Sequence, residues 1–309
     1  MNAILEVQNL LKNYGSYTAV DGISFEVPKG KIIGLLGPNG AGKTTTLQVL
    51  VGITQYNGGG IKYFGKDFAT NRQYCLQRIN FTSSFNTLQG KISVYENLLV
   101  FANLYSIKNA KNKIYKLADY FEISQILDQR YQNLSSGQKA RTGLIKSLIN
   151  DPELILMDEP TASLDPDIAD KTLLLIEKLN KENGLSILYT SHDMNEVTRI
   201  CDEVIFLDHG KIVAKDSPLG LTKRITHSNL KLTFDAGKNE VSKLLKTKRY
   251  NFSFINDHVV SLSIEEKLIP NIIFSLGENN IWITDIEVKK PTLEDVFLEI
   301  ARKGKNVVN

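Results

Sequence analysis

Apolar and polar positions follow two patterns along the chain, and each pattern indicates a different element of secondary structure. Short apolar runs bounded by turn residues predict strands, whereas apolar positions that recur every three or four residues predict helices with one buried face. Helices are expected directly after residue 42, over most of residues 94–149, and at residues 168–179 and 194–200. Strands are expected at residues 5–8, 23–27, 31–36, 154–157, 186–189 and 204–214, the last of these a hairpin that turns at residues 208–210.

Strands alternate with helices through the first part of the chain, which predicts an α/β core of mostly parallel sheet with an antiparallel part added. A helical insertion is expected at about residues 84–150. Turn-forming residues at 217–220 end this unit. Beyond them, strands at 230–234, 259–264 and 281–288 and helices near 239–246 and 292–302 predict a small α+β domain. We therefore expect two domains, residues 1–218 and residues 219–309.

Composition and charge exclude several classes of protein. Of the 309 residues, 42% are hydrophobic and 23% charged, which indicates a globular chain with a sizeable core and excludes a disordered or collagen-like one. The two cysteines, Cys75 and Cys201, are too few for a disulfide framework or a four-thiolate metal site. A net charge of +3 is too small to indicate a nucleic-acid partner. Because the chain shows neither a secretory signal nor a run of about 20 apolar residues, we expect no membrane span in it.

Residues 37–44 read GPNGAGKT and match the phosphate-binding pattern G-x-x-x-x-G-K-[ST] between a predicted strand and a predicted helix. Glycines let successive backbone amides turn toward one anion, and the helix that follows adds its N-terminal amides and the positive end of its dipole. Lys43 is then placed to reach the β- and γ-phosphates, and the hydroxyl of Thr44 to bind Mg²⁺. The alternative is a glycine-rich connector in which Lys43 is a solvated surface cation.

Two acids, Asp158 and Glu159, follow the apolar run at residues 154–157. In a parallel sheet the carboxyl ends of the strands line the ligand crevice. Asp158 suits Mg²⁺, usually through water, and Glu159 can polarise a water for attack on the γ-phosphate. The alternative is that the pair marks a strand end exposed to solvent.

Together with further motifs, these two features make residues 3–218 resemble the ATP-binding subunits of ABC transporters. Residues 134–138, LSSGQ, are similar to the family signature LSGGQ. Residues 161–165, TASLD, look like the D-loop with Asp165, and residues 190–193, TSHD, look like the segment with the switch histidine, His192. Tyr14 looks like the aromatic residue that stacks on adenine. The resemblance implies a P-loop NTPase core and an ATPase that uses ATP and Mg²⁺.

The resemblance also assigns roles to residues. Catalysis is implied for Lys43, Glu159 and His192, and Mg²⁺ binding for Thr44, Asp158 and, in place of the glutamine that the family usually has, the shorter Ser84. The signature residues Ser135, Ser136, Gly137 and Gln138 are implied to contact ATP held by the opposite chain, with Ser136 in place of a glycine. ATP binding is implied for Tyr14, Gly37, Pro38, Asn39, Gly40, Ala41, Gly42, Lys43, Thr44 and Thr45.

Several of these residues also have a structural interpretation. Ser135 and Gln138 fit a capping box, which needs no ligand. Asp165 followed by Pro166 fits a helix N-cap with proline at the first helical position. His192 could be an ordinary histidine at a strand end. Tyr17 lies three residues from Tyr14, so the residue that stacks on adenine stays open between the two.

The resemblance implies partners as well. Two protomers, identical or different, are expected to close head to tail over two ATP molecules and to open after hydrolysis. A separate membrane permease is expected to bind the helical insertion between about residues 84 and 133, which would hold the chain at the cytoplasmic face of the membrane as a peripheral subunit. Residues 291–297, PTLEDVF, look like the tail of ATPases that serve drug, antibiotic and polysaccharide exporters, so export is the expected direction. The alternatives are a soluble non-transport ABC ATPase and a nucleotide-dependent regulatory module.

Overall fold

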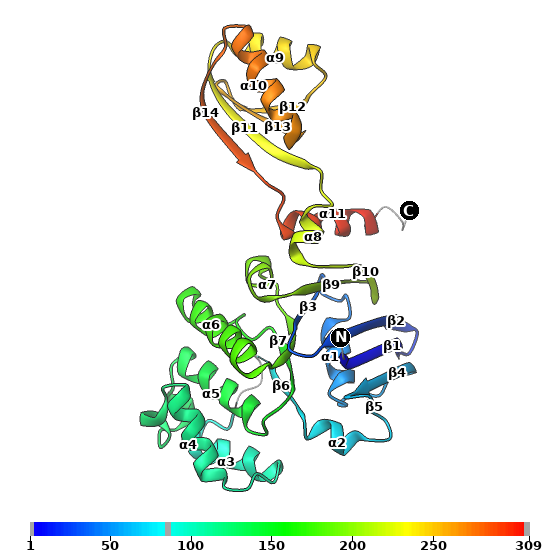
Figure 1. Cartoon of the computed structure of the whole chain (residues 1–309), viewed down its shortest axis with the longest axis vertical. Coiled ribbons are helices and arrows are strands. Elements are labelled where there is room, and N and C mark those ends of the chain that lie inside the picture. The colour runs from blue at the N-terminus through cyan, green and yellow to red at the C-terminus, as the bar shows by residue number, and fades with distance from the viewer. Residues whose placement is uncertain (1–2, 84–87, 306–309) are drawn as a thin grey trace. The chain divides into compact units, whose positions relative to one another are not determined.

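The computed structural model describes residues 3–83 and 88–305. Ser84, one of the expected metal ligands, lies outside the described residues. The chain divides into two compact units, Met1–Pro218 and Leu219–Asn309, which run from blue to green and from yellow to red in Figure 1. Within the described ranges, every helix is too short or too polar to cross a membrane.

The core of the first unit is a six-stranded sheet in which the expected buried strands lie side by side. Its order is β10 (Lys211–Asp216), β9 (Glu203–Asp208), β3 (Ile32–Leu36), β8 (Ser186–Thr190), β7 (Leu154–Asp158) and β6 (Ile79–Ser83). Neighbours from β9 to β6 pair in parallel, and β10 pairs antiparallel with β9. Every residue of β3, β7 and β8 is buried, which explains why these strands read as continuous apolar runs. The predicted α/β class is confirmed.

A second, antiparallel sheet completes the nucleotide-binding half of this unit. Its order is β2 (Tyr17–Pro28), β1 (Ala3–Tyr14), β4 (Gly58–Tyr63) and β5 (Lys66–Asp67). Helix α1 (Lys43–Leu50) buries Leu47 and Leu50 in one core cluster with residues of both sheets. The phosphate loop that precedes α1 is therefore anchored at both of its ends by buried elements.

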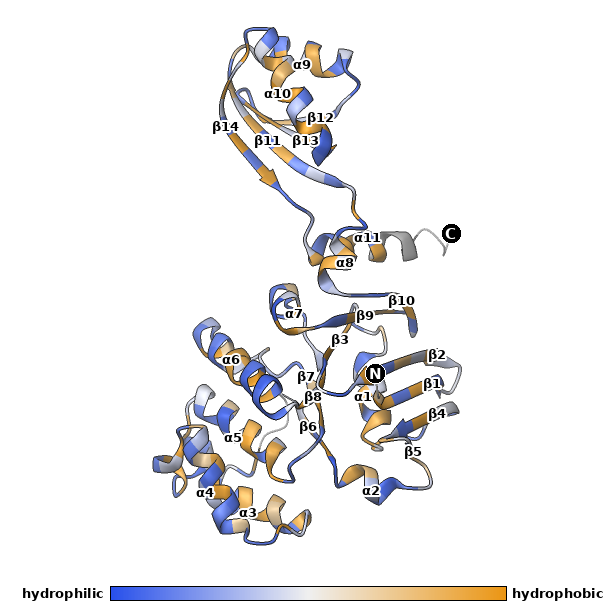
Figure 2. Ribbon diagram, in the orientation of Figure 1, coloured by the Kyte–Doolittle hydropathy of each residue, from blue (hydrophilic) through white to orange (hydrophobic). Residues whose placement is uncertain are grey.

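Helices make up the rest of the unit. The insertion contains α3 (Val94–Leu104), α4 (Ala110–Tyr120) and α5 (Ser136–Leu148), and α2 (Arg72–Leu76) precedes it. Helices α6 (Pro166–Asn183) and α7 (Met194–Ile200) follow the central strands β7 and β8. Figure 2 shows both hydrophobic and hydrophilic colours on α5 and α6, as expected for helices that bury one face.

The second unit is an α+β arrangement with the order βαββαβ. It comprises β11 (His227–Asp235), α9 (Lys238–Thr247), β12 (Asn251–Asn256), β13 (Val259–Glu265), α10 (Ile269–Glu278) and β14 (Trp282–Lys289), between α8 (Pro218–Thr222) and α11 (Leu293–Lys305). The sheet order β12-β13-β11-β14, antiparallel throughout, is that of ferredoxin-like folds. Alternate residues such as Leu230, Leu232 and Phe234 are buried in a core shared with both inner helices.

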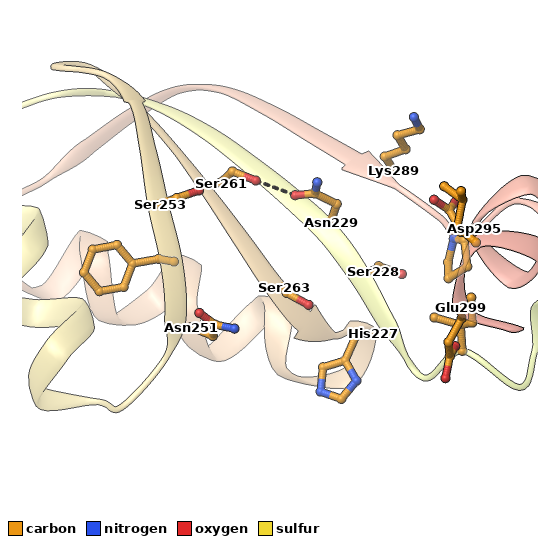
Figure 3. A pocket seen from close by; sticks show the side chains of 14 residues that line it. His227, Ser228, Asn229, Asn251, Ser253, Ser261, Ser263, Lys289, Asp295 and Glu299 are labelled. Atoms are coloured by element: carbon orange, nitrogen blue, oxygen red, sulfur yellow. Dashed lines mark hydrogen bonds between the residues drawn. The ribbon is translucent and has the colours of Figure 1, made fainter. Parts of the chain in front are cut away.

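The other face of this sheet carries small polar side chains. They line an open cavity of about 580 Å³, part of which is shown in Figure 3. The hydroxyl of Ser261 donates a hydrogen bond of 2.6 Å to Oδ1 of Asn229 across two strands, and Ser253, Ser263 and Asn251 lie on the neighbouring positions. The nucleotide-site motifs do not line this cavity, but Pro291 and Asp295 of the PTLEDVF segment do.

Candidate nucleotide-binding site

The phosphate loop joins β3 to α1, and two of its glycines are fixed there by neighbouring backbone. Gly37 has a φ of +152°, and a Cβ placed on it would lie 2.2 Å from the carbonyl oxygen of Leu207. Gly42 has a φ of +101°, and a Cβ on it would lie 2.3 Å from the carbonyl oxygen of Ala19. A side chain at either position would collide with β9 or β2, so only glycine lets the loop pack against both strands.

Lys43 begins α1 and is buried, with 6% of its surface exposed. Its ammonium donates hydrogen bonds to the carbonyl oxygens of Gly37, at 2.6 Å, and Pro38, at 3.1 Å. Burial lowers the pKa of Lys43, and the charges of Glu159 and Asp158 oppose that shift. The alternative interpretation of Lys43 as a solvated surface cation is wrong, because its ammonium is held inside the loop.

A cavity of about 250 Å³ opens in front of this loop. Both aromatic candidates for adenine, Tyr14 and Tyr17, lie at its edge and are exposed. The Tyr17 hydroxyl donates to the carbonyl oxygen of Gly40 at 3.2 Å, and the Lys12 ammonium lies 4.6 Å from the centre of the Tyr14 ring. The choice between the two tyrosines therefore stays open. The remaining lining residues are Ala19, Asn39, Gly40, Gly42, Lys43, Thr44, Thr45 and Glu159.

The two acids lie at the end of β7, and Thr190, the last residue of β8, forms hydrogen bonds with both of them. Asp158 is 9% exposed, and its Oδ1 accepts a hydrogen bond of 2.7 Å from the Thr190 hydroxyl. The amide of Glu159 donates to the Thr190 carbonyl oxygen at 3.1 Å and to its Oγ1 at 3.0 Å. Glu159 has a φ of +50°, which is uncommon for a residue with a side chain and frequent at functional sites. The alternative of a solvent-exposed strand end is wrong for Asp158.

His192 meets Glu159 at the cavity. Its Nε2 lies 2.6 Å from Oε1 of Glu159, and about half of the His192 side chain is exposed. The structure thus brings together residues that are far apart in the sequence: the phosphate loop, the acid pair and the switch histidine. Thr190 was not among the expected site residues, although a hydroxyl at the end of a buried strand beside that histidine is a signal that could have found it.

The donors at this site fit a magnesium ion. The exposed Thr44 lies in the cavity lining and Asp158 lies at the end of β7, directly before the lining residue Glu159, and Mg²⁺ prefers hydroxyl and carboxylate oxygen. Within residues 3–83 and 88–305, no group of three or more His, Cys, Asp or Glu side chains could hold a metal. A magnesium ion here would take its other ligands from phosphate and water, as it commonly does.

The signature segment opens α5 with the expected capping box. The Ser135 hydroxyl accepts from the Gln138 amide at 3.3 Å, and Oε1 of Gln138 accepts from the Ser135 amide at 3.0 Å. A Cβ on Gly137 would lie 3.1 Å from Cδ1 of Ile168, so this glycine allows close packing of α5 against α6 within one chain. Ser135 and Ser136 are exposed.

Asp165 stands at the N-cap position of α6, directly before Pro166. The expected N-cap position followed by a proline is confirmed, although the Asp165 side chain accepts no capping hydrogen bond. The φ of –62° and ψ of 151° give it the extended backbone of a helix entry, and the carboxylate itself is exposed.

Known proteins share this fold. The family model described as ABC transporter matches residues 20–162. The Nod factor export ATP-binding protein I of Ralstonia nicotianae is 38% identical over 228 residues, which cover 72% of this chain and 69% of that protein. This chain belongs to the ATP-binding subunits of ABC transporters. It is an ATPase, which binds ATP and hydrolyses it to ADP and phosphate in support of transport.

Another curated protein and two solved structures are also similar to this ABC ATPase. The linearmycin resistance ATP-binding protein LnrL of Bacillus subtilis is 29% identical over 305 residues, 96% of this chain and 98% of that protein. An ATP-binding cassette solved in its ADP conformation is 25% identical, with a TM-score of 0.65 over 73% of this chain and 95% of that one. The cbiO1 protein of Clostridium perfringens, part of the cbiONQ complex, is 26% identical, with a TM-score of 0.64 over 73% and 95%. The resemblance inferred from the sequence is confirmed.

Proposed function

We propose that this ABC ATPase powers export through a separate membrane permease. The observation that carries the proposal is the match to the linearmycin resistance protein, which spans 96% of this chain and so includes the second unit. The Nod factor relative, whose match covers 72% of this chain, is named for export. In this proposal the chain is a peripheral subunit that binds the cytoplasmic face of the membrane through its permease.

Each residue of the site has a proposed part in hydrolysis. The loop amides and Lys43 bind the phosphates. The Lys43 ammonium already donates hydrogen bonds to two carbonyl oxygens of the same loop. Glu159 accepts the proton of the attacking water, and His192, 2.6 Å from that carboxylate, fixes its orientation at the γ-phosphate. Thr44 and Asp158 hold Mg²⁺, with Ser84 a further proposed ligand outside the described residues. Magnesium, when bound, neutralises charge on the phosphate oxygens.

A second protomer is needed to complete each site. Among the described residues, the lining of the nucleotide cavity includes the phosphate loop and Glu159 but none of residues 135–138. Ser135 and Ser136 are nevertheless exposed at the start of α5, where amides and a hydroxyl can contact phosphate from outside the chain. These observations support a dimer in which the signature residues of one chain contact the ATP bound to the other.

The permease is proposed to bind the helical insertion. Helix α3 exposes two large apolar side chains, Val100 at 50% and Leu104 at 69%. Apolar side chains that gather on one exposed helix are typical of a protein contact rather than of a solvated surface. These two residues support docking at the described part of the insertion.

Transport by the reconstituted complex tests this function. The complex would be purified from native membranes through a tag on this chain, placed in liposomes, and given Mg-ATP outside with a fluorescent amphipathic drug. Because outside ATP reaches only ATPase subunits on the outer surface, export predicts that the drug accumulates in the lumen. The Glu159→Gln complex should accumulate none. Release of preloaded drug on addition of ATP would show import and contradict the proposal.

A further inference from the structure

A buried carboxylate outside the nucleotide cavity joins the two turns that carry the reacting side chains. Glu196 lies in the first turn of α7 and is 9% exposed. A single oxygen of it, Oε2, accepts hydrogen bonds from the hydroxyls of Tyr189 at 2.7 Å, Thr161 at 2.8 Å and Ser191 at 2.8 Å. All three donors are uncharged hydroxyl groups, and such a network stays fixed only while each member keeps its partner.

The donors come from segments on both sides of the catalytic residues. Thr161 lies two residues after Glu159 and opens the segment that leads to Asp165. Ser191 comes directly before His192, and its hydroxyl also accepts a hydrogen bond of 3.0 Å from the amide of Asp193. Glu196 therefore ties the turn after β7 to the turn after β8. Those two turns are the ones whose separation sets the contact of 2.6 Å between Glu159 and His192.

We propose that Glu196 is a positioning residue for ATP hydrolysis, which holds Glu159 and His192 in register through Thr161 and Ser191. Glu196 does not line the nucleotide cavity, so it acts through these partners rather than on ATP. The proposal rests on the roles given above to Glu159 and His192. It adds Glu196 to that site. Through Thr161 and Ser191, Glu196 also links the segment that leads to Asp165 with the switch histidine.

The network depends on Oε2 of Glu196 as its shared acceptor. A carboxylate oxygen accepts charge-assisted hydrogen bonds, which are about twice as strong as those that a neutral amide oxygen accepts. Burial, with a contribution from the charge of Glu196, raises the pKa of Tyr189 and keeps its phenol a donor. Replacing Glu196 by glutamine should therefore weaken the three shared hydrogen bonds while leaving the volume of the side chain nearly unchanged.

The experiment separates positioning from stability. ATP turnover, the affinity for ATP by calorimetry and the melting temperature would be measured on the full chain with Glu196→Gln, Thr161→Val and Thr161→Ser. We expect Glu196→Gln and Thr161→Val to lower kcat by about 10- to 100-fold, the usual effect of a displacement of about 1 Å at a reacting group, with little change in ATP affinity. Thr161→Ser, which keeps the hydroxyl, should retain most of the activity. A matched control is Glu182→Gln, since Glu182 accepts a tyrosine hydroxyl at 3.1 Å on the surface.

A double variant supplies the decisive result. Adding Thr161→Val to Glu196→Gln should cost little more than either change alone, because both remove the same network. Unchanged kcat in the single variants, or a loss equal to that of Glu182→Gln, would overturn the proposal, as would full additivity. Glu159→Gln and His192→Ala are measured alongside. If those two leave turnover intact, the assignment of the catalytic residues fails, and that failure is distinct from any result at Glu196.

Discussion

The nucleotide site of the first unit and the open sheet face of the second unit both gather polar side chains, yet they hold them in different ways. At the nucleotide site, Lys43 at the start of α1 and Asp158 at the end of β7 are buried and bonded to backbone or hydroxyl partners. On the sheet face of the second unit, residues such as Asn229 and Ser261 bond across strands in an open cavity. Burial fixes geometry and makes each partner necessary, whereas exposure leaves water as a substitute.

The difference follows from where each group lies in its sheet. Strands β7 and β8 are parallel and buried on both faces, so their polar residues appear at the ends, in one crevice. The strands of the second unit are antiparallel and covered by helices on one face, so polar residues alternate along the other. Precise chemistry is expected where side chains converge and are buried. We expect changes at the first site to be costly and changes on the second face to be tolerated.

The largest effect is expected from Glu159→Gln. Loss of a general base lowers turnover by about 10²- to 10⁴-fold, while ATP should still bind because Lys43 and the loop amides are unchanged. The matched change in the second unit, Asn229→Ala, should leave the rate of phosphate release as it is. Phosphate release and ATP calorimetry check both variants. A Glu159→Gln chain that turns over ATP at the parental rate would refute the assignment of the base.

The next effect in size concerns glycines. Gly42→Ala combines a φ of +101° with a Cβ 2.3 Å from the Ala19 carbonyl oxygen, so the free energy of unfolding should fall by at least about 2 kcal/mol and ATP affinity with it. Gly65→Ala is the control, because Gly65 has a φ of +73° and open space around its Cβ. It should cost only the backbone strain, about 1–2 kcal/mol. Chemical denaturation measures both, and equal losses would show that the contact with Ala19 is unimportant.

A buried lysine predicts how stability changes with pH. The Lys146 ammonium donates to the Phe81 carbonyl oxygen at 2.6 Å, and burial lowers the pKa of Lys146 from 10.5 to about 8. Because the unfolded chain then holds this proton more tightly than the folded chain, the group disfavours folding below pH 8 and the penalty disappears as the pH rises toward 10.5. Compared with Lys146→Met, the parent should gain stability between those values with a slope approaching about 1.4 kcal/mol per pH unit. If the difference in unfolding free energy between the parent and Lys146→Met stayed the same across this pH range, the buried position of the ammonium would be contradicted.

The smallest effect has the opposite sign and lies in the second unit. Gly277 sits within α10, and a Cβ on it would have open space around it. Gly277→Ala should therefore stabilise the chain by about 0.4–1 kcal/mol, because alanine loses less backbone entropy on folding. Calorimetric melting measures the change. A loss of stability would show a constraint at this glycine like the one at Gly42.

Sequence patterns predicted the parts of the molecule in which local signals agree with the fold. The phosphate loop follows a buried strand and precedes a helix, and the acids end an apolar run, so Lys43 and Glu159 could be placed from sequence. Strand β4 gave no such signal, because three of its residues, 58–60, are glycines that favour turns. A Cβ on Gly59 would lie 2.3 Å from the carbonyl oxygen of Asn9, so pairing with β1 decides its structure.

Contacts between distant segments could not be predicted in this way. The left-handed backbone of Glu159, the packing of Gly137 against Ile168 and the missing capping bond at Asp165 depend on neighbours that only the folded chain provides. The same holds for Glu196, since Thr161 and Tyr189 are separated from it by 35 and 7 residues.

We propose that each ATP is held between the phosphate loop of one chain and the signature of another. Sedimentation velocity on the Glu159→Gln chain tests this arrangement directly, because this variant is expected to bind ATP without consuming it. We expect a monomer without nucleotide, a dimer with Mg-ATP, and a monomer again when Ser136→Arg is added, with ATP still bound by calorimetry. A Glu159→Gln chain that stays monomeric when saturated with ATP, or that dimerises equally with Ser136→Arg, would contradict a site shared between two copies.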